Sequence, residues 1–223
     1  MNDDIISIGR RRPVFYWLAA CAVIAASGCV EDEELPYATE VVSFEPGEGA
    51  GFGADEMPDV VLGPPDGRGT TSASLDVVSL GDGGEIVVAF GEREIVDGDG
   101  DDFVVFENPF WPAGDAEQVY AELGEVAVSR DGEQWHSFSC DFGVDDPPPY
   151  EGCAGWTPTL DFDADEVNPL DLEKTGGDGF DLADVGLERA RYVRIRDLWG
   201  IGEEPVRGFD LDAVGLINFT DEP

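Results

Sequence analysis

Short runs of alternating apolar and polar residues recur along the chain. Residues 191–196 read Arg-Tyr-Val-Arg-Ile-Arg, a pattern that predicts a half-buried strand with its arginines turned outward. Residues 103–106 are apolar at every position, as expected for a strand buried on both faces in the middle of a sandwich. Similar runs predict further strands at 40–44, 74–80, 85–90, 119–129, 134–138 and 211–217.

The segments between these runs carry turn sequences. Gly81–Gly84 and Arg130–Glu133 are tight turns, and each would join the strands on its two sides into a hairpin. Residues 140–184 are rich in Pro and Asp and are expected to be mostly loop, with one helical turn at 170–174. About eight short strands, no long amphipathic helix and no repeat predict an all-β fold, an antiparallel β-sandwich of the jelly-roll type with long loops.

The amino terminus has the features of an export signal. Arg10–Arg12 precede the apolar run Val14–Ala26, whose 13 residues are too few to span a bilayer as a helix. The following Ser-Gly-Cys resembles a bacterial lipobox, in which Cys29 would be lipidated; an ordinary secretory signal with an incidental cysteine is the alternative. We therefore predict a lipid anchor in the bacterial envelope, at the outer membrane or cell surface. The predicted divisions are a lipoprotein signal at 1–28, an acidic linker at 29–38 and one β-sandwich domain at 39–223.

The net charge of the chain limits the classes of partner that it can bind. It has 50 acidic and 12 basic side chains, for a net charge of −38. Such a charge repels nucleic acid and anionic lipid, so we expect no nucleic-acid partner and membrane contact only through the lipid anchor. It also opposes compaction unless cations or salt screen it. Bound divalent cations are one explanation of this negative charge, and adaptation to a saline medium is another. The two explanations are compatible.

A Gly-spaced acidic loop precedes the apolar strand at 103–106. Asp97, Asp99 and Asp101 alternate with other residues there, and several carboxylates in one flexible loop favour a hard, oxygen-binding cation such as Ca²⁺. The loop is not an EF-hand, because the twelfth position is Asn108 rather than Glu. A solvated Asp-Gly turn is the alternative, and Asp210 with Asp212 forms another acidic pair. The predicted calcium ligands are Asp97, Asp99, Asp101, Asp102, Glu107, Asp178 and Asp181.

Two cysteines remain after Cys21 in the signal and Cys29 at the lipobox. In an exported protein, Cys140 and Cys153 are best explained as a disulfide, since there is no CxxC and His136 is the sole histidine.

Aromatic residues in the loops offer surfaces for stacking on sugar rings. Plugging the ends of the sandwich is the alternative role for such residues, and Trp135, in a predicted strand, is expected in the core. The candidate ligand-binding aromatics are Trp111, Tyr150, Trp156 and Trp199.

Two segments carry a family resemblance. Val128–Trp135 (V-S-R-D-G-E-Q-W) resembles a hairpin of the discoidin and coagulation-factor C-type domains and related carbohydrate-binding modules, and Ala190–Ile195 (A-R-Y-V-R-I) resembles their arginine strand. Asp102–Asn108 and Gly176–Leu182 are similar to segments of poorly characterised bacterial cell-surface proteins. The resemblance implies a galactose-binding-like jelly roll and binding rather than catalysis. It carries over no sugar-contact residue, and those domains usually tie their ends with a disulfide, whereas the pair here is internal.

These features together predict a lipid-anchored cell-surface binding module, stabilised by Ca²⁺, with a glycan or another envelope component as partner. A structural or adhesive envelope protein without a small ligand is one alternative, and a glycan-active hydrolase on the same scaffold is another. We predict that the chain is not an enzyme and assign no catalytic residue, since the sequence has no G-x-S-x-G, P-loop or dinucleotide fingerprint.

Overall fold

A computed structural model describes residues 35–116, 118–140, 150–162, 167–168, 170–198 and 208–221. The predicted signal, Cys29 and Trp199 lie outside these residues. The described strands are β1 Glu40–Glu45, β2 Val78–Ser79, β3 Glu85–Ala89, β4 Glu94–Val96, β5 Phe103–Glu107, β6 Gly124–Ser129, β7 His136–Ser137, β8 Cys153–Ala154, β9 Asp178–Phe180, β10 Arg189–Ala190, β11 Tyr192–Asp197, β12 Asp210–Leu216 and β13 Phe219–Thr220. The helical turns are α1 Leu172–Thr175, η1 Asp59–Val61, η2 Pro112–Gly114 and η3 Leu182–Val185.

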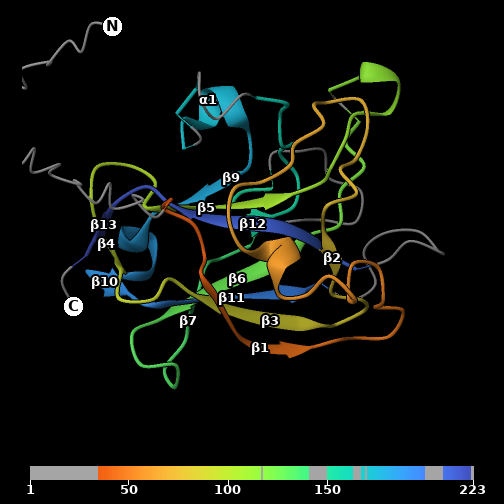
Figure 1. The fold of residues 1–223 in the computed structure, drawn as a ribbon. Helices are drawn as coiled ribbons and strands as arrows, with labels where there is room; N and C mark the ends of the chain where they lie inside the picture. Colours follow the sequence, from red (N-terminus) through yellow and green to blue (C-terminus); the bar gives the residue numbers. More distant parts are fainter. Residues whose placement is uncertain are drawn as a thin grey trace, which may run out of the picture. The chain divides into compact units, whose positions relative to one another are not determined.

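Two antiparallel sheets make up most of the domain. One has the order β1-β3-β11-β6-β7, with β8 also paired to β6, and the other has the order β2-β12-β5-β9. A small third sheet, β10-β4-β13, lies at one end. Figure 1 shows the β12-β5-β9 strands stacked over β6, β11 and β3. This arrangement confirms the predicted all-β, sandwich-like class. Among the described residues, no helix combines the length and apolar character needed to cross a bilayer.

The period of the side chains explains the two layers. Alternate residues of β3, β6 and β11 enter one core between the sheets, while the residues between them lie on the opposite face of their sheet. β5 is buried on both faces, as its uninterrupted apolar sequence predicts: Phe103 and Val105 join this core, and Val104 and Phe106 pack in a second cluster with Tyr37. Tyr37, assigned to the linker from the sequence, is thus part of the folded domain.

One predicted hairpin is confirmed and the other is wrong. β6 and β7 pair through the Arg130–Glu133 turn, where Asp131 Oδ1 accepts hydrogen bonds from the backbone N–H of Glu133 and Gln134, both at 2.8 Å. β2, in contrast, pairs with β12, while β3 pairs with β1 and β11. The segment Gly81–Gly84 therefore carries the chain from one sheet to the other.

Other local predictions also diverge from the structure. The strand expected at 119–129 is confined to β6, and β8 and β9 lie in a region expected to be loop. The helical turn expected at 170–174 is present as α1. Trp135 is not in the core: it is half-buried on the outer face, with the Arg194 guanidinium carbon 4.6 Å from the centre of its ring. An outward arginine thus gives this indole a cation–π partner.

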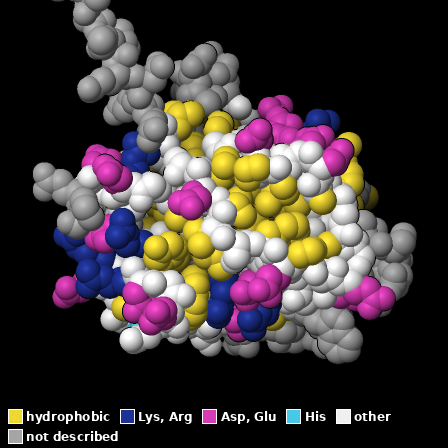
Figure 2. Space-filling view, turned by 60° about the horizontal axis from the view of Figure 1, so that its bottom comes forward, with side chains coloured by type: hydrophobic (Ala, Val, Ile, Leu, Met, Phe, Trp, Pro, Cys, Tyr) yellow, Lys and Arg dark blue, Asp and Glu magenta, His cyan; other side chains and the backbone are white. Residues whose placement is uncertain are grey.

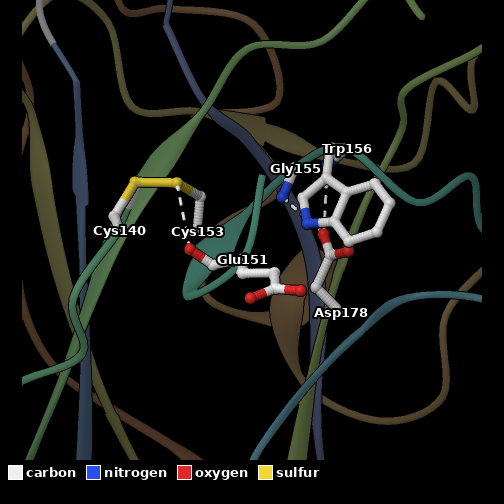
Figure 3. Close-up of a disulfide and its surroundings, with 6 residues drawn as sticks. All are labelled: Cys140, Glu151, Cys153, Gly155, Trp156 and Asp178. Atoms are coloured by element: carbon white, nitrogen blue, oxygen red, sulfur yellow. Dashed lines mark hydrogen bonds between the residues drawn. A yellow bond between two sulfur atoms is a disulfide. The ribbon is translucent and has the colours of Figure 1, made fainter. Parts of the chain in front are cut away.

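The predicted disulfide between Cys140 and Cys153 is confirmed, with Cα atoms 4.5 Å apart (Figure 3). Cys153 is buried in β8 opposite Glu125 of β6. The bond therefore holds β8, a strand of only two residues, against the larger sheet.

Candidate functional site

Asp102 organises the end of the domain that carries the acidic loop. It is fully buried, and its Oδ1 accepts hydrogen bonds from Gly98 N at 2.8 Å and Asn218 Nδ2 at 2.9 Å. Its Oδ2 accepts a hydrogen bond from Leu182 N at 2.8 Å. One carboxylate therefore ties the acidic loop to η3 and to the chain after β12.

The structure brings three of the predicted calcium ligands together here. Oxygens of Asp97, Asp102 and Asp181 lie within 4.8 Å of one another. Desolvation and then the charges of Asp102 and Asp181 raise the pKa of both Asp97 and Asp101. Asp99 is exposed in the loop. We call Asp97, Asp102 and Asp181 the loop cluster.

Asp178 lies apart from the loop cluster, in a groove. Its Oδ2 accepts hydrogen bonds from Gly155 N at 2.7 Å and Trp156 N at 3.1 Å (Figure 3). Burial raises the pKa of Asp178 to about 6 in spite of these hydrogen bonds. The groove, of about 430 Å³, is also lined by Asp101 and Asp184. We call it the Trp156 groove.

Glu107 belongs to a different cluster from the one predicted. It ends β5, whereas Asp102 precedes that strand, and five steps along an extended chain separate the two by about 16 Å. One ion could not bind both carboxylates. Glu107 instead lies with Glu122, just before β6, and Asp210, the first residue of β12; oxygens of these three residues lie within 4.8 Å of one another. We call them the floor cluster.

The floor cluster contains buried oxygens without a hydrogen-bond partner among the described residues. Glu107 is 1% exposed and Glu122 is 4% exposed. Glu107 Oε1 accepts a hydrogen bond from Asp210 N at 3.3 Å, but Glu107 Oε2 and Glu122 Oε1 have no partner in the part of the chain that the structure describes. Buried polar atoms are rarely left so in folded proteins.

Electrostatics in the floor cluster disfavour three negative charges. Burial, with added repulsion from Asp210 and Glu122, raises the pKa of Glu107 well above its usual range. Burial and then Asp210 raise the pKa of Glu122 to about 8. Burial also raises the pKa of Asp210, although hydrogen bonds from Ser79 and Asn108 oppose the shift. The cluster therefore favours positive charge, as protons or as a cation.

A cavity of about 480 Å³ opens above this cluster. Glu122 and Asp210 line its floor, and Glu107 lies buried behind them. Phe110 and Tyr120 form one wall as stacked rings, with centroids 5.2 Å apart. The remaining walls include Phe52 and Leu75, which are 50% and 66% exposed. No Lys or Arg is among the described residues that line this space, which we call the floor cavity.

The predicted ligand-binding aromatics lie elsewhere. Trp111 is half-buried at the start of η2. Tyr150 and Trp156 form an edge-to-face pair with centroids 6.5 Å apart. None of these three lines the floor cavity, whose aromatic walls the sequence analysis missed. An acid directly after a fully apolar strand, as in Phe106-Glu107, is the signal that points to a buried carboxylate there.

The surface acids are dispersed on the face shown in Figure 2. A band of apolar side chains crosses this face, with separate groups of acidic and basic side chains around it. The negative charge of the chain is therefore not gathered into one patch on this side.

No family model matches the chain, and no curated protein matches it either. The resemblance to discoidin-type domains stays a prediction, and the site is defined by its own geometry.

Proposed function

We propose that this chain is an exported, lipid-anchored binding module of the cell surface, and that it holds a neutral carbohydrate in the floor cavity. One observation carries the proposal: the cavity combines apolar, aromatic walls with two carboxylates on its floor. Sugars present apolar ring faces beside hydroxyl donors, and a concave site with a few convergent polar groups suits them.

The chemistry of the floor cavity narrows the ligand class. Carboxylate oxygens of Glu122 and Asp210 accept hydrogen bonds from hydroxyl groups. In their ionised form these carboxylates repel phosphates, sulfates and acidic sugars. Stacked Phe110 and Tyr120 supply a flat apolar surface for a ring. The preferred ligand is therefore a neutral glycan.

A glycan array followed by calorimetry on the full chain tests the proposal. Tyr120→Ala removes part of the cavity wall and should weaken binding at least tenfold. Trp156→Ala, which removes an aromatic from the Trp156 groove, is the matched control and should leave binding unchanged. Loss of binding only in Trp156→Ala would move the site to that groove. If no glycan binds, the cavity is not a carbohydrate site, and a structural role in the envelope is favoured.

A hydrolase is the second candidate, favoured by one observation. Glu122, with a pKa of about 8, lies beside Asp210 in the same cavity, as a proton donor lies beside a second carboxylate in glycosidases. Under this alternative, chromogenic aryl glycosides are turned over, and Glu122→Gln and Asp210→Asn each abolish turnover. Glycan binding without turnover would exclude it.

A further inference from the structure

We infer that the floor cluster of Glu107, Glu122 and Asp210 binds one hard divalent cation, Ca²⁺, and that the ion presents open coordination positions to the floor cavity. The second half of this inference rests on the proposed carbohydrate function, whereas the first half does not.

The unpaired oxygens distinguish the floor cluster from the loop cluster. In the loop cluster both oxygens of Asp102 accept hydrogen bonds, and Asp181 Oδ1 accepts one from Ala183 N at 2.8 Å. Among the described residues, the loop cluster therefore has no buried oxygen without a hydrogen-bond partner. In the floor cluster, Glu107 Oε2 and Glu122 Oε1 are buried without a partner among the described residues. A cation held among the three carboxylates would give both oxygens a partner.

The donor set selects the class of metal. All three side chains offer carboxylate oxygens, and the ions that prefer such ligands are hard cations such as Ca²⁺ and Mg²⁺. The ligands come from β5, from the segment before β6 and from β12, and irregular sets of this kind suit the flexible coordination of Ca²⁺. Asn108 Nδ2 lies 3.5 Å from Asp210 Oδ2 and donates to Ser74 O at 2.8 Å, so it orients one ligand from outside.

The position of the cluster leaves one side of the ion open. Glu107 is buried behind the floor, and only Glu122 and Asp210 reach the cavity. Ca²⁺ takes about 6–8 oxygens, more than three carboxylates in this arrangement supply on one side. Water or a pair of sugar hydroxyls fills the remaining positions from the cavity. The ion then replaces the repulsion among the carboxylates with an attraction for hydroxyl oxygen.

Calorimetry with CaCl₂ alone on chelator-treated full chain tests the ion. One site should be found, and Glu122→Gln should weaken Ca²⁺ binding by about tenfold or more, because a direct ligand matters at least as much as a residue that only orients one. Glu107→Gln serves as the second variant, with circular dichroism to confirm its fold. Asp97→Asn, in the loop cluster, is the matched control and should bind Ca²⁺ like the parent. Absence of Ca²⁺ binding, or weakening by Asp97→Asn and not by the Glu variants, would overturn the inference.

Glycan titrations with Ca²⁺ and with chelator separate this inference from the proposed function. Binding that is lost in chelator and in Glu122→Gln supports an ion that contacts the sugar. If the glycan binds equally well in Ca²⁺ and in chelator, the ion does not contact the sugar, and the proposed function still stands. Ca²⁺ binding with no glycan bound would reject the proposed function and leave the ion site supported.

Discussion

Replacement of Asp102 by alanine should destabilise the domain by about 4 kcal/mol. The substitution leaves three donors without their acceptor, namely Gly98 N, Leu182 N and Asn218 Nδ2. The bond from Leu182 N is buried, and its loss costs about 2 kcal/mol because water does not replace the acceptor. The other two bonds are partly buried, and each contributes about 1 kcal/mol.

Urea denaturation followed by tryptophan fluorescence measures this loss as a shift of the midpoint. Asp99→Ala, an exposed acid of the same loop, is the control and should change stability by less than about 0.5 kcal/mol. The Asp102 loss should be equal in Ca²⁺ and in chelator, since the hydrogen bonds need no ion. A loss of unfolding free energy below about 1 kcal/mol, or one that disappears in chelator, would refute the stabilising role assigned to the hydrogen bonds of Asp102.

Three further predictions concern stability. Replacing Cys140 and Cys153 by serine should cost about 3 kcal/mol, because the sequence separation of 13 closes a short loop in the unfolded chain; an unchanged urea midpoint would contradict this. Asp178 has a folded pKa of about 6 against a model-peptide value of 3.8, so its contribution to stability is complete below the lower value and is lost as pH rises through the higher one. Relative to Asp178→Asn, the parent should lose about 2 kcal/mol between pH 4 and pH 7, and parallel stability curves would exclude the shift. Phe103→Ala should cost about 3–5 kcal/mol, because its buried ring packs on Phe180 with centroids 5.2 Å apart; melting at the parent's temperature would argue against this packing.

Local sequence signals predicted the elements that local interactions decide. The alternation at 191–196 and the Asp131 turn were sufficient for β11 and for the β6–β7 hairpin. The turn Gly81–Gly84 has equally strong hairpin chemistry, yet Val78 pairs with Leu211 of the distant β12. Pairing with a strand distant in the sequence therefore prevailed over the local hairpin. The strands of two or three residues, such as β10 and β13, are too short to show a period.

The candidate site was only partly accessible from the sequence. Asp97, Asp102 and Asp181 belonged to the predicted set, and the structure brings their oxygens within 4.8 Å of one another. Glu107 was grouped with them because it is close in sequence. An extended strand, however, holds its two ends far apart in space. Glu122 interrupts an apolar run and looks like an outward residue of a strand, although it is 4% exposed. Its burial depends on β12, which is distant in the sequence.

The most direct test of the account is the thermal unfolding of the full chain in low-salt buffer, first in chelator and then with Ca²⁺ at about 100 times its dissociation constant. Binding to the folded state at this concentration adds about 2.7 kcal/mol, which should raise Tm by about 5–10 °C for a domain of this size. The rise should be absent in the Glu107→Gln, Glu122→Gln double variant. An identical Tm of the parent in chelator and in Ca²⁺ would contradict a cation at the floor of the cavity.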